Sequence, residues 1–81
     1  MTRSISPAPP LVKARDCLKA LQRAGFYVDH QTGSHARLFH RTRPELKITI
    51  PFHNKDLPQG TLRSILRQAD LSVEEFLGLL G

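Results

Sequence analysis

The chain has 81 residues, and its 12 Lys and Arg against 7 Asp and Glu give a formal net charge of +5. This length suits one small domain. So basic a composition favours a polyanionic partner, most simply a nucleic acid. No apolar run approaches the roughly 20 residues that cross a membrane, and residues 1–10 lack the apolar centre of a signal peptide. We therefore expect a cytoplasmic protein that does not associate with membranes.

The cysteine and histidine content argues against disulfide and metal chemistry. Cys17 is the single cysteine, so it forms no internal disulfide, and its place in a helical apolar stripe predicts burial. The four histidines follow one another at spacings of five, five and thirteen residues, which match no common metal-binding motif. We expect neither a metal nor another cofactor.

Residues 1–10, with the sequence MTRSISPAPP, are rich in Pro and Ser and predict a flexible tail before a domain of residues 11–81. A helix is predicted next, from Leu11 to its stop at Gly25, because glycine suits the left-handed end of a helix. The apolar residues of this helix recur at three- and four-residue spacing and are Ala14, Cys17, Leu18 and Leu21.

Beyond Gly25 the apolar period shortens to two residues. Three stretches rich in aromatic and β-branched residues predict strands, at Phe26–Gln31, His35–Arg41 and Leu46–Pro51. Short turn sequences separate these stretches, so we expect an antiparallel meander. The third strand alternates apolar and polar residues, which predicts one covered and one open sheet face.

Two helices are predicted in the last third of the chain. Apolar spacing predicts a helix over residues 61–69, with Thr61 as its N-cap. Ser72 and Glu75 form a capping-box pattern that predicts a short last helix, VEEFLGLL. The predicted fold is therefore α+β, an α-β-β-β-α order with both main helices on one face of a three-stranded antiparallel sheet, followed by a short C-terminal helix.

Basic residues concentrate in the middle of the chain, whereas the last fourteen residues hold three acidic residues and no Lys or Arg. We therefore expect the middle of the chain to face an anion. The basic residues there are Arg37, Arg41, Arg43, Lys47, Lys55, Arg63 and Arg67.

The stretch TGSHARLFHRT places His35 where a turn enters a strand. Strand parity puts His35 and Arg37 on one face, but it leaves open which face is buried, because Leu38 and Phe39 compete for the core. If Leu38 faces the helices, His35 and Arg37 stand on the open face beside Lys47.

An imidazole in this place is chemically able to cleave RNA. Imidazole titrates near neutrality, so His35 can take a proton from a ribose 2′-hydroxyl while Arg or Lys side chains hold the phosphate. Gly33 and Ser34 would let backbone amides approach that phosphate closely. Periodicity alone equally fits an exposed histidine that bonds within the turn, and the same plain interpretation holds for His30, His40 and His53.

Two long runs, LKALQRAGFYVDHQTGSHARLFH and ITIPFHNKDLPQGTLRSILRQADLS, strongly resemble the HicA-type toxins, the mRNA interferases of bacterial HicAB toxin-antitoxin systems. The resemblance covers about Leu11 to Phe76. Its motifs are the helix ending in AGF, the GSH triplet, the P-x-H after the third strand, and LPQGTLRSILRQA. Taken in this order and spacing, they are specific.

The resemblance implies a fold like the double-stranded-RNA-binding domain, ribosome-independent cleavage of mRNA, and neutralisation by a cognate HicB antitoxin. It also implies that the histidine of the GSH triplet, His35, is catalytic. Many members carry a histidine or polar residue after the triplet, where this chain has Ala36, so the second acid-base group stays open between His53 and Lys47. Expected RNA contacts are Gly33, Ser34, Arg37, Lys47, Lys55 and Arg63.

Two other functions fit the sequence less well. A non-catalytic double-stranded-RNA-binding module would carry a lysine cluster at the start of its last helix. Here that position reads GTLRSILRQA, with Arg63 and no lysine. A transcriptional repressor would need a recognition helix with base-reading side chains facing outward together, and the chain shows none.

Overall fold

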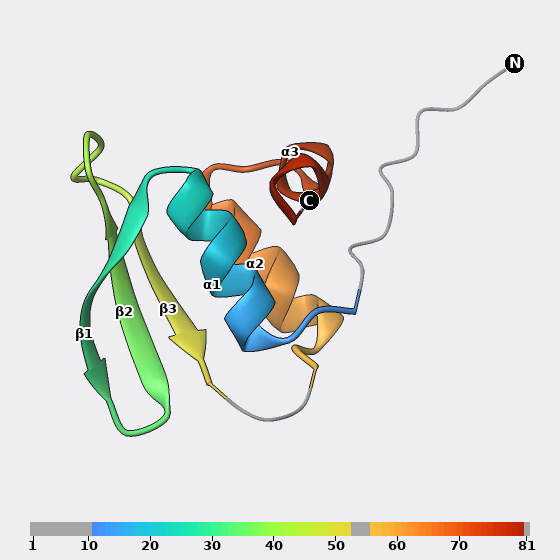
Figure 1. Cartoon of the computed structure of the whole chain (residues 1–81), viewed down its shortest axis with the longest axis horizontal. Coiled ribbons are helices and arrows are strands. Elements are labelled where there is room, and N and C mark those ends of the chain that lie inside the picture. Colours follow the sequence, from blue (N-terminus) through green and yellow to red (C-terminus); the bar gives the residue numbers. More distant parts are fainter. Residues whose placement is uncertain (1–10, 53–55, 81) are drawn as a thin grey trace, which may run out of the picture.

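The computed structural model describes residues 11–52 and 56–80 (Figure 1). The elements are, in chain order, α1 (Ala14–Arg23), β1 (Phe26–Thr32), β2 (His35–His40), β3 (Lys47–Pro51), α2 (Gln59–Ala69) and α3 (Val73–Leu80). This order confirms the predicted α+β fold. The tail predicted for residues 1–10 lies outside the described residues. Within the described part of the chain, no helix combines the length and the apolar character needed to span a membrane.

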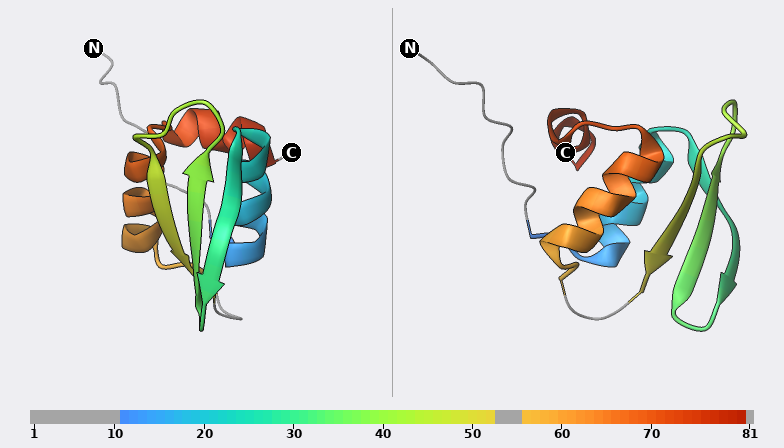
Figure 2. Two further views of the ribbon diagram at one scale, coloured as in Figure 1. Left: turned by 90° about the vertical axis from the view of Figure 1, so that its left-hand side faces the viewer. Right: turned by 180° about the vertical axis from the view of Figure 1, so that it is seen from behind.

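The three strands form one antiparallel sheet in the order β1-β2-β3, as the meander prediction requires. Both main helices lie on one face of this sheet, with α1 behind β1 and α2 behind β3 (Figures 1 and 2). Helix α3 packs against α1. The described elements leave the other sheet face open to solvent (Figure 2); we call it the open face.

Strand alternation decides the competition between Leu38 and Phe39. Leu38 is fully buried and pairs with Ile48, which is 1 % exposed, whereas Phe39 is half-buried on the open face. The opposite choice would bury the charged Arg37 and Lys47 without partners, at a cost of several kcal/mol. The covered face meets apolar residues of the two main helices, chiefly Cys17, Ala20, Leu21, Leu62, Ile65 and Leu66.

The predicted starts of both main helices are wrong by a few residues. Helix α1 begins at Ala14 and not at Leu11, because the preceding backbone pairs with the segment before α2: the Val12 carbonyl accepts the Leu57 N–H at 2.8 Å. Helix α2 begins at Gln59 with Pro58 as its N-cap, and no side chain caps it. Thr61 therefore lies inside the first turn and is not the N-cap.

The predicted helix ends and the last cap are confirmed. Gly25 follows the end of α1 with a φ of 104°. The Ser72 N–H donates to Oε1 of Glu75 at 2.8 Å, and the Glu75 N–H donates to Oγ of Ser72 at 3.0 Å, which completes the capping box of α3.

Candidate functional site

A β-bulge in β1 decides which of its side chains reach the open face. Val28 pairs with Leu38, but the next pair joins His30 to Arg37, so Asp29 is an extra residue. Strict alternation would put His30 on the covered side with Val28. The bulge instead turns His30 to the open face, beside Arg37.

A shallow depression lies on the open face near the β1–β2 turn. Its volume is about 90 Å³, and its lining consists of His30, Thr32, His35, Ala36, Arg37 and Thr49. His30 is opposite Arg37, and His35 is opposite Thr32. The two histidines are therefore diagonal neighbours, a relation in which residues of an antiparallel pair lie roughly 7–8 Å apart. The fold thus brings two imidazoles and one guanidinium to a single place.

Gly33 and Ser34 form the two-residue turn that precedes His35. Only Gly33 of the pair has a positive φ, 58°, as in a type II′ hairpin turn. A Cβ on Gly33 would meet nothing within 4 Å, so the backbone conformation and not crowding favours glycine here. The Ser34 carbonyl accepts the N–H of Phe52, which ties the turn to the chain beyond β3. His35 is thereby held at the first position of β2.

The imidazole of His30 has a carboxylate partner. Its Nδ1 donates to Oδ2 of Asp29 at 2.8 Å, and both side chains are exposed. Its Nε2 has no hydrogen-bond partner among the described residues. Sequence reasoning gave His30 no functional role. The available signal was the Asp-His pair itself, because a neighbouring carboxylate often orients an imidazole.

Two aromatic rings extend the open face beyond the depression. Tyr27 and Phe39 pack edge to face with ring centres 6.4 Å apart. The Arg41 guanidinium lies 5.5 Å from the centre of the Tyr27 ring, and the Lys47 ammonium lies 6.0 Å from that of Phe39. Aromatic rings flanked by cations are suited to stacking bases of single-stranded nucleic acid.

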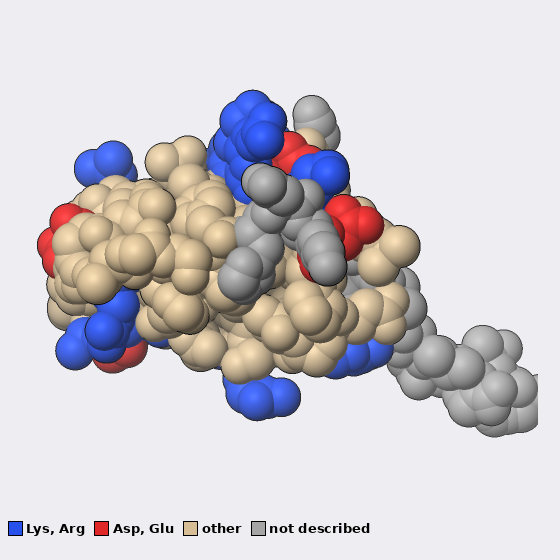
Figure 3. All heavy atoms as spheres, turned by 90° about the horizontal axis from the view of Figure 1, so that it is seen from below, with Lys and Arg blue, Asp and Glu red and all other residues tan. Residues whose placement is uncertain are grey.

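The basic residues expected to face an anion are spread over both layers. Arg37 and Lys47 are exposed on the open face, but Arg63 is exposed on α2 in the helical layer. Lys55 and the candidate His53 lie outside the described residues. Seen from below, the molecule carries its Lys and Arg side chains at separate places and not in one patch (Figure 3).

Arg43 is occupied by acidic partners. Its Nη1 lies 3.0 Å from Oδ2 of Asp70, and its Nε donates to Oε2 of Glu45 at 3.1 Å. Hydrogen bonds to Asp70 and then to Glu45 raise the pKa of Arg43. A backbone hydrogen bond, and then the bond from Arg43, hold the pKa of Glu45 below its ordinary value. Arg43 therefore joins the β2–β3 connection to the end of α2.

His40 is a structural residue. Its Nε2 donates to the Ala24 carbonyl at 2.9 Å, and its Nδ1 accepts the backbone N–H groups of Thr42 and Arg43, both at 3.1 Å. Its ring also packs edge to face on Phe26, with ring centres 4.7 Å apart. The imidazole thus joins the end of α1 to the turn after β2.

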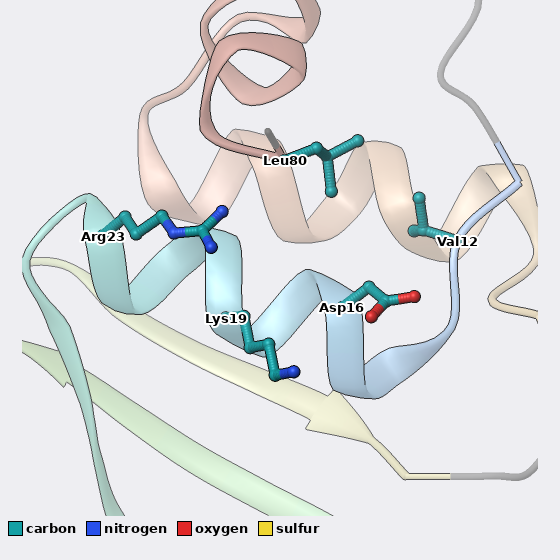
Figure 4. A pocket seen from close by; sticks show the side chains of 5 residues that line it. All are labelled: Val12, Asp16, Lys19, Arg23 and Leu80. Carbon is teal, nitrogen blue, oxygen red and sulfur yellow. The ribbon is translucent and has the colours of Figure 1, made fainter.

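A larger hollow, of about 360 Å³, lies between α1 and the end of α3 in the helical layer (Figure 4). Its lining consists of Val12, Asp16, Lys19, Arg23 and Leu80. These side chains include no imidazole, and one acidic residue stands among the two basic ones. The candidate site is therefore the smaller depression on the open face.

The chemistry available in the depression is proton transfer and anion binding. Imidazoles exchange protons near neutral pH, and a guanidinium binds phosphate through paired donors. In residues 11–52 and 56–80, no three His, Cys, Asp or Glu side chains are grouped so that they could hold a metal ion.

Comparison with known families gives the class of the protein. The profile of a family described as the HicA toxin of bacterial toxin-antitoxin systems matches residues 14–71. The chain is thus a toxin of the toxin-antitoxin class. It belongs to the HicA toxin family, as the sequence resemblance indicated. The matched range includes the whole sheet and the depression. Among curated proteins, no match to the chain was found.

Proposed function

We propose that this toxin is an endoribonuclease that cleaves mRNA, with His35 as an acid-base catalyst. The observation that supports this role is the place of His35, exposed on a paired strand and lining the same depression as Arg37. A residue on a hydrogen-bonded strand keeps its orientation better than one on a loop, as proton transfer requires.

The reaction uses a nucleophile that RNA itself carries. His35 takes the proton of the 2′-hydroxyl, and the 2′-oxygen attacks the adjacent phosphorus. Arg37 would balance the negative charge that grows on the phosphate oxygens, and the backbone amides of Gly33 and Ser34, which directly precede His35, would assist it. We expect no metal ion or other cofactor to be needed.

The rest of the open face is proposed to hold single-stranded RNA. Lys47 would pair with a phosphate, while Tyr27 and Phe39 would supply aromatic surface for bases. Lys55 stays a proposed contact from sequence alone. Arg63 lies in the helical layer, so it would meet only an RNA long enough to leave the open face and pass around the sheet edge.

A toxin of this class has an antitoxin partner, which we propose is a small HicB-type protein. To block the site, it should cover the His35 face and present acidic or apolar surface to Arg37 and Lys47. Co-expression of the gene beside this one should relieve growth arrest. Persistent arrest, with both proteins present at equal levels, would contradict this pairing.

Incubation of the purified protein with a synthetic single-stranded RNA in chelator, followed by gel analysis, tests the activity. We expect cleavage that leaves a 5′-hydroxyl on the downstream product. RNA binding without cleavage would instead favour the non-catalytic RNA-binding module.

A further inference from the structure

Cleavage by the 2′-hydroxyl needs two proton transfers on opposite sides of the phosphorus. One group takes the proton of the 2′-oxygen, and another gives a proton to the departing 5′-oxygen. A base that has just been protonated on the attacking side is poorly placed to serve the leaving side in the same step. If His35 acts as in the proposed function, on which this inference rests, a second side chain must stand across the phosphate from it.

The register of the sheet places His30 where it could face His35 across a bound phosphate. Arg37 stands directly opposite His30 and two residues along β2 from His35, so the three side chains form a triangle on the open face. A phosphate held by Arg37 would have one imidazole on each side. Diagonal neighbours lie roughly 7–8 Å apart along the sheet, and both imidazoles line the same depression of about 90 Å³, which is the space we assign to the phosphate.

The earlier candidates for the second group are less well placed. Lys47 pairs with Phe39, and its ammonium lies over that ring, outside the lining of the depression. His53 lies outside the described residues. His30, in contrast, lines the depression together with His35.

The partner of His30 also fits a proton donor. Asp29 accepts the Nδ1 hydrogen at 2.8 Å, which leaves Nε2 to exchange a proton with the substrate. The carboxylate balances the positive charge of the ring when both nitrogens carry hydrogen. Asp29, the extra residue of the bulge, is thus a positioning residue for His30.

We propose that His30 is the general acid of the cleavage reaction, paired with His35 as the general base. His35 accepts the 2′-hydroxyl proton as the bond from the 2′-oxygen to phosphorus forms. The bond from phosphorus to the 5′-oxygen breaks, and that oxygen takes the proton from Nε2 of His30. The products are a 2′,3′-cyclic phosphate and a 5′-hydroxyl. His35 ends protonated and His30 neutral, and exchange with water restores both.

A substrate with a leaving group that needs no proton tests this assignment. The linkage cut by the wild-type protein is first mapped, and a second RNA is made with sulfur in place of the 5′-oxygen at that linkage. A thiolate leaves readily without a proton, because thiols are far stronger acids than alcohols. Single-turnover rates are then measured on both RNAs for wild type, His30→Ala, His30→Gln and His35→Ala.

We expect both His30 variants to cleave ordinary RNA about 10²- to 10⁴-fold more slowly than wild type. On the sulfur RNA they should come within about tenfold of the wild-type rate, whereas His35→Ala should be slow on both. Gln31→Ala is the matched control, because Gln31 is also exposed and is adjacent to His30 but lies outside the depression, and it should behave like wild type. Asp29→Asn should show a smaller loss that the sulfur RNA also removes, which a merely structural role would not produce.

Normal cleavage of ordinary RNA by His30→Ala and His30→Gln would overturn the assignment while leaving His35 and the proposed function intact. So would equal slowing on both RNAs in variants with unchanged melting curves. Recovery of His35→Ala on the sulfur RNA, without recovery of His30→Ala, would reverse the two roles and contradict the proposal. If wild type cleaves neither RNA, the proposed function fails and this inference fails with it.

Discussion

The imidazole of His40 occupies the space that a side chain on Gly25 would need. A Cβ built on Gly25 would lie 2.7 Å from Nε2 of His40, and this same Nε2 donates to the Ala24 carbonyl. Two independent features therefore favour glycine at position 25: its φ of 104° and the His40 ring packed against its Cα. This contact explains the glycine that ends α1 in the AGF motif.

Replacement of Gly25 by alanine should destabilise the fold. A left-handed conformation costs an L-residue roughly 1–2 kcal/mol, and displacement of His40 from Ala24 adds about 1 kcal/mol for the lost hydrogen bond. We expect a loss of about 2–3 kcal/mol in the free energy of unfolding, measured by urea denaturation. In the background of His40→Ala the loss should be smaller, because the ring is already gone; equal losses in both backgrounds would refute the contact.

His35 and His40 lie on the same strand but should respond oppositely to alanine. His35→Ala removes an exposed side chain, so the melting curve should stay unchanged while RNA cleavage falls about 10²- to 10⁴-fold. His40→Ala removes three hydrogen bonds to backbone groups, so stability should fall by about 2 kcal/mol. Below its melting temperature the His40 variant should still cleave RNA. If His35→Ala cleaved RNA at the wild-type rate, His35 would not be the catalytic residue.

The salt dependence of RNA binding should distinguish the two layers. If Arg37 and Lys47 each neutralise one phosphate, replacing either by alanine should reduce the slope of log affinity against log salt by about 0.7. Arg63→Ala removes an equal charge from α2 and should leave the slope for a short RNA unchanged. Fluorescence anisotropy with a labelled RNA that cannot be cleaved measures the affinity at each salt concentration. Equal effects of all three substitutions would mean that only overall charge matters.

Cys17 should be unreactive until the protein unfolds. Burial raises the pKa of its thiol from 9.0 to about 12, so the folded protein holds almost no thiolate at pH 8. A disulfide reagent should modify the thiol in urea but not in buffer. The unfolded thiol ionises above pH 9 and the folded one only near 12, so this contribution to stability is complete below pH 9 and is lost as pH rises. By pH 10 the free energy of unfolding should have fallen by about 1 kcal/mol. Rapid modification of Cys17 in the folded protein would contradict its burial.

Local patterns in the chain determined the order and type of every element. The apolar spacing of Cys17 and Leu21, the period of two in the strands and the capping box at Ser72 each reflect contacts within a few residues. Such contacts do not depend on the rest of the fold, and for this reason they can be recognised in sequence. The GSH triplet likewise drew attention to His35, because a turn and the strand after it are neighbours along the chain.

Only the tertiary structure decided what surrounds His35. The bulge at Asp29 inserts one residue into β1 and reverses the parity of everything after it, which no regular alternation can foresee. That reversal brings His30 to the open face beside Arg37. Pairing of distant segments likewise set the start of α1 and brought Asp70 into an ion pair with Arg43. The packing of the two layers placed Arg63 away from the open face. These outcomes depend on contacts between residues far apart along the chain, and a local pattern contains no record of them.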